Sequence, residues 1–168
     1  MGVDELLDDE AFDPQKLFNE EEYSTLIIGR EGLNKKENNT ADLLESLLEK
    51  EISRQESEAI FAKLKETNSQ KVMMDALQTA NRVNEKTILT AACWECGLDF
   101  TPYFLEFVKL AIHEDFQLAL EGLTVVESIE SVMEEKTLTA ALKIAESAKS
   151  PNKDLVSALV ENIKLRIA

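Results

Sequence analysis

Apolar and polar residues follow one another along most of this chain with the period of α-helices. From Thr40 to the C-terminus, apolar side chains recur every three or four residues, a spacing that places them on one face of a helix. Polar residues that favour helix starts precede these apolar runs. The apolar spacing and these start signals together predict an all-α fold of about eight helices. The predicted helices begin near Asn39, Ser53, Ser69, Asn84, Thr101, Asp115, Ser131 and Ser150.

Several of these helix boundaries have specific local chemistry. Ser53-Arg54-Gln55-Glu56 has the spacing of a capping box, and Ser131-Val132-Met133-Glu134 resembles a second one. Thr101-Pro102 and Ser150-Pro151 each place a cap residue before a proline at the first helical position, where the missing N–H costs nothing. Gly97 follows an apolar stripe at the place where a residue of left-handed conformation often ends a helix.

The helix starts recur at a nearly constant spacing. The first, third, fifth and seventh helices are offset by about 30, 32 and 30 residues, and the alternate helices by about 31, 31 and 35. Two-helix units of this length are typical of α-solenoids, in which stacked pairs bury one continuous core. We therefore predict a right-handed α-α superhelix of four antiparallel pairs over residues 40–168. A compact helical bundle is the alternative, but it gives no reason for a constant offset.

The segment Phe104–Ile129 resembles a HEAT repeat, with a first helix of paired apolar residues, a short acidic turn and a second helix that contains Ala-Leu-x-Gly-Leu. Val83–Phe100 is similar to the second half of the preceding unit. The likeness covers residues 69–168 well and residues 40–68 loosely, and it does not separate HEAT from armadillo repeats. It implies a scaffold or adaptor with a binding surface and no catalytic chemistry. The second helices depart from the pattern, because they lack the basic residue that often follows the acidic turn.

Acidic residues are concentrated near the N-terminus. The net charge is −15, and residues 1–40 hold 11 acidic and 4 basic side chains. We predict that residues 1–39 form an acidic, partly ordered extension that lays its apolar residues on the main domain, and a docking motif for a partner is the alternative. The charge argues against binding to nucleic acid or to anionic membranes, and it favours a protein partner with a basic or mixed patch.

Cys93 and Cys96 have the Cys-x-x-Cys spacing that invites a redox or metal interpretation. On a helical wheel both thiols share the apolar face with Leu89 and Ala92. They lie in the last turn of their helix, where the helix dipole opposes a thiolate, whereas a redox pair uses the first turn. A zinc site would need four ligands, and the chain has two cysteines and one histidine. We interpret them as buried structural thiols, with no cofactor and no bound metal.

Trp94 lies on the opposite side of the same helix, in line with Thr87 and Thr90. Two interpretations are open: the ring packs within its repeat, or it is an aromatic anchor in a binding surface. A polar stripe on the next second helix either meets water or touches another protein; its members are Gln117, Glu121, Thr124 and Ser128. Gly122 lies opposite this stripe, where its lack of a side chain would let a neighbouring helix approach closely.

The sequence therefore predicts a cytoplasmic, non-catalytic protein-interaction or scaffold module. No stretch approaches the ~20 apolar residues that cross a membrane, and reduced cysteines are usual in the cytoplasm. His113 has no partner nucleophile or acid in sequence reach, so an enzymatic role for it is not expected. The alternatives are a thiol-based redox protein that uses Cys93 and Cys96, and an acidic regulator that occupies a basic cleft of its partner.

Overall fold

The computed structural model describes residues 35–49 and 52–168, and this part of the chain is all-helical, without strands, as predicted. It holds eight α-helices and a short 3-10 turn, η1 (Thr101–Tyr103). The predicted extension, residues 1–39, lies outside the described residues except for its last five, which already belong to a helix. The helices are α4 (Lys35–Leu48), α5 (Arg54–Glu66), α6 (Gln70–Thr79), α7 (Val83–Glu95), α8 (Phe104–Ala111), α9 (Phe116–Ser128), α10 (Glu135–Glu146) and α11 (Lys153–Ile167).

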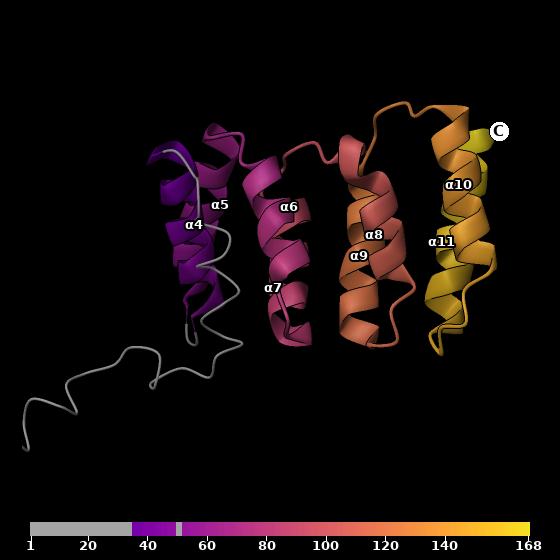
Figure 1. Cartoon of the computed structure of the whole chain (residues 1–168), viewed down its shortest axis with the longest axis horizontal. Coiled ribbons are helices and arrows are strands. Elements are labelled where there is room, and N and C mark those ends of the chain that lie inside the picture. Colours follow the sequence, from indigo (N-terminus) through magenta and orange to yellow (C-terminus); the bar gives the residue numbers. More distant parts are fainter. Residues whose placement is uncertain (1–34, 50–51) are drawn as a thin grey trace, which may run out of the picture.

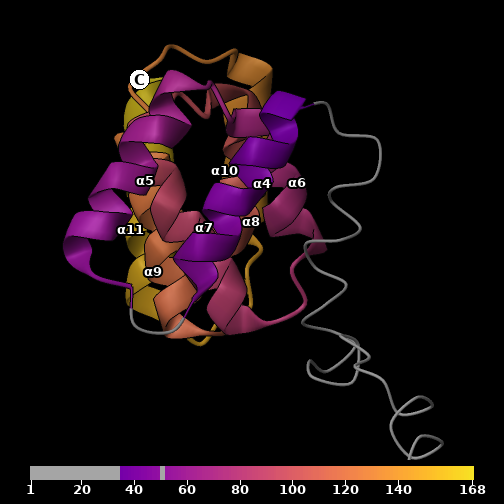
Figure 2. The ribbon, with the colours of Figure 1, turned by 90° about the vertical axis from the view of Figure 1, so that its left-hand side faces the viewer.

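The two helices of each pair lie side by side, and the pairs follow one another along the long axis of the molecule in chain order (Figure 1). Helix α9 packs on both α7 and α11, while α8 packs on α10 and α4 packs on α6. Figure 2 looks along this row and places α5, α9 and α11 toward one side and α6, α8 and α10 toward the other. Most contacts between neighbouring pairs therefore join a second helix to a second helix or a first helix to a first helix, and α4 also contacts α7.

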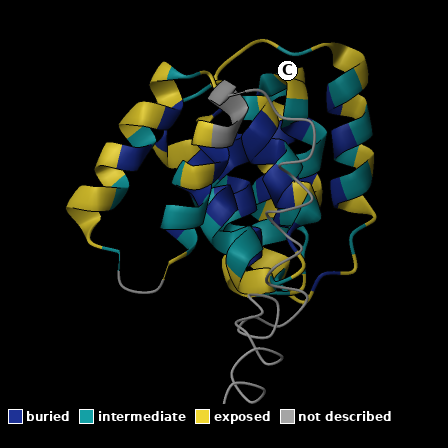
Figure 3. Cartoon of the chain, turned by 60° about the vertical axis from the view of Figure 1, so that its left-hand side comes forward, coloured by how far each residue is buried: buried dark blue, intermediate teal, exposed yellow. Residues whose placement is uncertain are grey.

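The residues coloured as buried in Figure 3 gather toward the middle of the helical array. The core runs from Leu44 of α4 to Ile163 of α11 as one cluster of contacting residues. Its largest members lie around α8, where the rings of Phe100 and Phe107 meet edge to face with centroids 5.7 Å apart. This edge-to-face arrangement suits the charge distribution of aromatic rings. Since the core is shared by all the pairs, no single pair buries its apolar face alone.

Polar contacts connect the starts of successive pairs along one edge of the row. The hydroxyls of Thr40 and Ser69 lie 3.2 Å apart, and the side-chain amide of Gln70 donates to the carbonyl oxygen of Asp99 at 3.5 Å. The hydroxyl of Ser131 donates to the Asp99 carboxylate at 3.3 Å. These contacts join residues about 30 positions apart in the sequence. This separation is close to the predicted offset between successive helix pairs. We call these three contacts the junction contacts.

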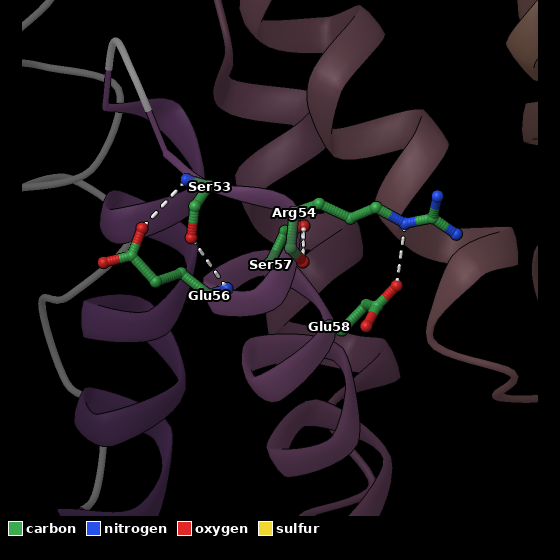
Figure 4. A network of polar contacts seen from close by, with 5 residues as sticks. All are labelled: Ser53, Arg54, Glu56, Ser57 and Glu58. Atoms are coloured by element: carbon green, nitrogen blue, oxygen red, sulfur yellow. Dashed lines mark hydrogen bonds and ion pairs between the residues drawn. The ribbon is translucent and has the colours of Figure 1, made fainter.

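The helix starts with the most specific local chemistry are confirmed. Ser53 and Glu56 form a capping box, in which the Glu56 N–H donates to the Ser53 hydroxyl and the Ser53 N–H donates to the Glu56 carboxylate (Figure 4). Asp115 caps α9 by accepting from the N–H of Leu118 at 2.9 Å. Gly97 follows α7 with a φ of +68°, the left-handed conformation that glycine adopts without steric cost.

Other predicted starts are wrong by a few residues. Helix α10 begins at Glu135, so Ser131 opens no helix; its hydroxyl bonds to Asp99 instead. Helix α11 begins at Lys153; the Ser150 hydroxyl accepts from the N–H of Asn152 and donates to the carbonyl oxygen of His113. Helix α4 begins four residues before the predicted start at Asn39. In the first two cases the serine hydroxyl bonds to a distant segment before the helix begins.

The observed helices keep an approximate two-helix period. First helices start at residues 35, 70, 104 and 135, and second helices at 54, 83, 116 and 153, so the offsets run from 29 to 37 residues. The spread is wider than predicted because η1 and the connections 129–134 and 147–152 take up residues that the sequence pattern assigned to helices.

Gly122 lets α8 and α9 approach closely, as predicted. A Cβ atom built on Gly122 would lie 2.7 Å from the backbone nitrogen of Ala111 and 2.9 Å from the carbonyl carbon of Leu110. Real Cβ atoms essentially never come so close to backbone. Helix α9 is thereby fixed against α8, and its opposite face is left free to carry Gln117 and Glu121.

Candidate functional site

Trp94 lies in the last turn of α7 with 39% of its surface exposed. Its indole Nε1 donates a hydrogen bond of 2.8 Å to Oε2 of Glu121 on α9. The second oxygen of Glu121 accepts a 2.9 Å bond from the side-chain amide of Gln117, one turn earlier on α9. Three of the predicted partner-binding residues, which are separated in sequence by up to 27 positions, therefore meet on the surface of two neighbouring second helices.

Glu95, the residue after Trp94 in the sequence, adds a second carboxylate that acts electrostatically on Glu121. The pKa of Glu95 is raised above its ordinary value, first because the side chain is partly buried and second because Glu121 carries a like charge. The guanidinium of Arg54 on α5 lowers it in part. We call the group formed by Trp94, Glu95, Gln117 and Glu121 the Trp94 surface. It combines an exposed aromatic ring with two carboxylates that repel each other.

We predict that Glu95→Gln stabilises the protein slightly at neutral pH. Because the pKa of Glu95 is raised in the folded state, folding favours the protonated form, and ionisation reduces stability as the pH rises through the folded pKa. Solvent screening keeps the effect small, so we expect Tm to rise by about 1–2 °C at pH 7.5. Below the ordinary glutamate pKa the difference from the wild type should vanish.

Thermal unfolding followed by circular dichroism at pH 7.5 and at about pH 3.5, which is below the ordinary glutamate pKa, checks this prediction. The control is Glu135→Gln, which removes the same charge from an exposed position in the first turn of α10. At that position the partial positive charge of the helix N-terminus stabilises the carboxylate, so the control variant should gain no stability. An equal gain in both variants would point to overall charge instead of the repulsion between Glu95 and Glu121.

Two predicted residues of α7 do not extend this surface. Thr90 was predicted to be available to a partner, but it is fully buried, and its hydroxyl donates to the carbonyl oxygen of Lys86 at 2.6 Å. Helix α7 packs on α4, α6 and α9, so its exposed arc is narrower than a helical wheel suggests. Thr87 is half-buried, and its hydroxyl donates to the carbonyl oxygen of Val83.

Thr124 and Ser128 continue the polar stripe of α9 beyond the Trp94 surface. The Thr124 hydroxyl donates to the carbonyl oxygen of Leu120 at 2.9 Å, and the Ser128 hydroxyl donates to that of Val125 at 2.7 Å. Both hydroxyls therefore bond within their own helix. Thr124 is half-buried and Ser128 is exposed, so the stripe runs along α9 away from Trp94.

The two cysteines are free and buried, with exposures of 1% for Cys93 and 3% for Cys96. The Cys93 thiol donates to the carbonyl oxygen of Leu89 at 3.2 Å, and the Cys96 thiol to that of Cys93 at 3.5 Å. Burial raises the pKa of both thiols, and the neighbouring Cys96 raises that of Cys93 further. The arrangement opposes the thiolate that redox chemistry requires.

Concave features on the described surface are small or open. A groove of about 190 Å³ lies between α6, α7 and α8, and Leu77, Lys86 and Leu110 are among its lining residues. Its volume is below the usual size of a small-molecule site. Two larger depressions follow the outer face of α10 and are lined by residues of that helix and its C-terminal end alone. These shapes suit a protein surface better than an enclosed ligand.

Neither a metal-binding cluster nor a membrane-spanning helix lies within residues 35–49 and 52–168. Within these ranges no three metal-binding side chains converge, and His113 uses Nδ1 to accept a hydrogen bond from the Asp115 N–H. None of the helices in the same ranges combines the length and the apolar character required to cross a bilayer.

Glu95 is a member of the Trp94 surface that the sequence did not predict. Its position directly after Trp94 was no signal for a shared surface, because adjacent residues of a helix do not face each other. Arg54, whose charge acts on Glu95, was not predicted either, since its place depends on how the helices pack.

Comparisons of the chain with protein-family models, with curated proteins and with solved structures found no match.

Proposed function

We propose that this chain is a non-catalytic protein-interaction module of the scaffold type, and that the Trp94 surface is its binding site. The observation that carries the proposal is the hydrogen bond between the half-exposed indole of Trp94 and Glu121 of the neighbouring second helix. It holds the ring in one orientation before any partner arrives, and a preordered aromatic side chain loses little entropy on binding. Tryptophan is also the residue type most enriched among binding hot spots.

We further propose that the helix pairs form a right-handed superhelix of the HEAT or armadillo type, with antiparallel helices in each pair. The chain-order row in Figure 1, the contacts between alternate helices and the junction contacts support this arrangement. In such a solenoid each layer of helices presents a continuous surface. The Trp94 surface lies on the layer of second helices, across the boundary between two pairs. We place the module in the cytoplasm, where its two free cysteines would stay reduced.

We predict that Trp94→Ala loses most of its partner. The variant removes the exposed ring and the hydrogen bond to Glu121, and truncation of a hot-spot residue typically weakens binding by about 30-fold or more. The measurement is affinity purification of the tagged full-length protein from native cells, with quantitative mass spectrometry of the proteins that co-purify. Loss of specific proteins, relative to the wild type, is the expected result.

The matched control for this experiment is Leu165→Ala. Leu165 is another large exposed apolar residue, with 77% of its surface accessible, but it lies on α11 at the C-terminal end of the row. It should retain the partners that Trp94→Ala loses. If Trp94→Ala keeps every partner, the proposed site is wrong.

The Trp94 surface also bears on the second candidate function, an acidic regulator that occupies a basic cleft. A protein with a net charge of −15 and paired carboxylates could present its charge in place of a nucleic acid. Partner binding would then fall steeply with salt, whereas an aromatic-anchored surface would depend on salt only weakly. Binding measured at several salt concentrations separates the two functions.

A further inference from the structure

The carboxylate of Glu121 is held by two donors and still has capacity to accept. Its Oε2 accepts from Trp94 and its Oε1 from Gln117, at 2.8 and 2.9 Å. Each carboxylate oxygen has two lone pairs, so one acceptor site remains on each oxygen. The group is therefore fixed in position beside the indole ring, with both oxygens available to a further donor.

Among the described residues, one cation is recorded as acting on the carboxylates of this surface. Glu121 and Glu95 carry like charges that repel each other, and Arg54 is the cation that acts on Glu95. Arg54 is engaged elsewhere, because its Nε lies 2.9 Å from Oε1 of Glu58 (Figure 4). An external cation would relieve the repulsion and would find its hydrogen-bond acceptors already in place.

The shape of the site selects among cations. A guanidinium is planar, stacks on an indole ring and pairs with a carboxylate through two parallel N–H groups. A lysine ammonium can lie over the ring but cannot form the paired contact. A quaternary ammonium is usually bound by a cage of aromatic rings, and this surface has one ring. A metal ion would need at least three ligating side chains, and such a group does not occur among the described residues.

We propose that the Trp94 surface binds an arginine side chain of a partner protein, with the guanidinium stacked on the Trp94 ring and paired with the carboxylate of Glu121. Glu95, which interacts electrostatically with Glu121, supplies a second negative charge. The occupant is a basic segment of a protein, chosen by charge complementarity, because the charge of the surface repels nucleic acid. This inference rests on the proposed function, to which it adds the chemistry of the partner.

Trp94 offers a specific probe, because it is the single tryptophan of the chain. The experiment follows the indole N–H resonance of the ¹⁵N-labelled full-length protein during titration with the acetylated and amidated peptide Ala-Arg-Ala-Arg-Ala. Parallel titrations use peptides with citrulline, which is the neutral isostere of arginine, or with lysine in place of both arginines. We expect a saturable shift with the arginine peptide, about fivefold weaker binding of the lysine peptide and no saturation with citrulline.

Two variants test the role of the carboxylate. Glu121→Gln keeps an oxygen that can accept from the Trp94 indole but removes the charge, so arginine-peptide binding should weaken about fivefold while Tm stays within about 2 °C of the wild type. Glu135→Gln removes one charge from α10 and should leave the titration unchanged. Equal shifts with the arginine and citrulline peptides, an unaltered affinity in Glu121→Gln, or no shift at millimolar peptide would each overturn the inference.

The two proposals fail in different ways. If Trp94→Ala loses its cellular partners but the arginine peptide does not bind, the interaction module stands and the arginine preference is wrong. If the peptide binds as expected but Trp94→Ala keeps every cellular partner, the arginine preference stands and the proposed function is wrong.

Discussion

Gly122→Ala should destabilise the protein by about 2 kcal/mol, although alanine is the better helix former. The new methyl group would lie 2.7 to 2.9 Å from atoms of Leu110 and Ala111 in α8, and two of the three nearest are backbone atoms. A backbone atom cannot turn aside as a flexible side chain can, so α8 and α9 would have to separate. This separation would open gaps in the shared core on both sides of the contact.

The measurement is thermal or urea unfolding followed by circular dichroism. A loss of about 2 kcal/mol corresponds to a fall in Tm of roughly 4–8 °C for a chain of this size. The control, Thr139→Ala, adds the same residue at an exposed position of α10, where it should be neutral or slightly stabilising. If Gly122→Ala gained stability like the control, the close approach of α8 and α9 would not depend on the glycine.

Both thiols should react with iodoacetamide at least about 100-fold more slowly in the native protein than in 6 M guanidinium chloride. Alkylation needs an accessible thiolate, and here burial hides the sulfur atoms and raises their pKa values. Reaction must therefore wait for the structure to open, which is rare in a stable domain. Cys96 should react before Cys93, because it lies at the end of α7, where helices open most readily.

Mass spectrometry of the alkylated peptides over time measures both rates. The denatured protein provides the reference for intrinsic reactivity, so no variant of the core is needed. Slow labelling of both residues would exclude the thiol-based redox alternative for this state of the protein. Labelling of either cysteine within a few-fold of the denatured rate would show an accessible thiol and would revive that alternative.

The sequence predicted those features that depend on neighbouring residues. The capping box at Ser53, the cap at Asp115 and the left-handed Gly97 need only local chemistry, and all three are confirmed. The prediction for Gly122 also held, because a glycine inside a long helix is rarely retained without a close contact. The all-α fold was predicted from the helical spacing of the apolar residues. That spacing can be read within each segment of the sequence by itself.

Features that depend on distant segments of the chain were harder to predict from the sequence. The hydroxyls of Ser131 and Ser150 bond to groups 32 and 37 residues away, and the helices that these serines were predicted to open begin later. Thr90 shares a helix face with Trp94, but the number of helices around α7 decides which of the two is buried. Placing Trp94, Gln117 and Glu121 in one surface required knowing that α7 packs on α9, which periodicity alone does not state.

The junction contacts also determine how the row of helix pairs responds to mechanical force. A pull on its two ends loads the contacts between pairs, because the hydrogen bonds within each helix belong to one pair and do not bridge to the next. The hydrogen bonds at Ser69, Asp99 and Ser131 bridge successive pairs and therefore bear part of this load. Helix α5 packs chiefly on α4, so the N-terminal pair is joined to the rest of the row mainly through α4. We therefore expect the N-terminal pair to separate first under tension.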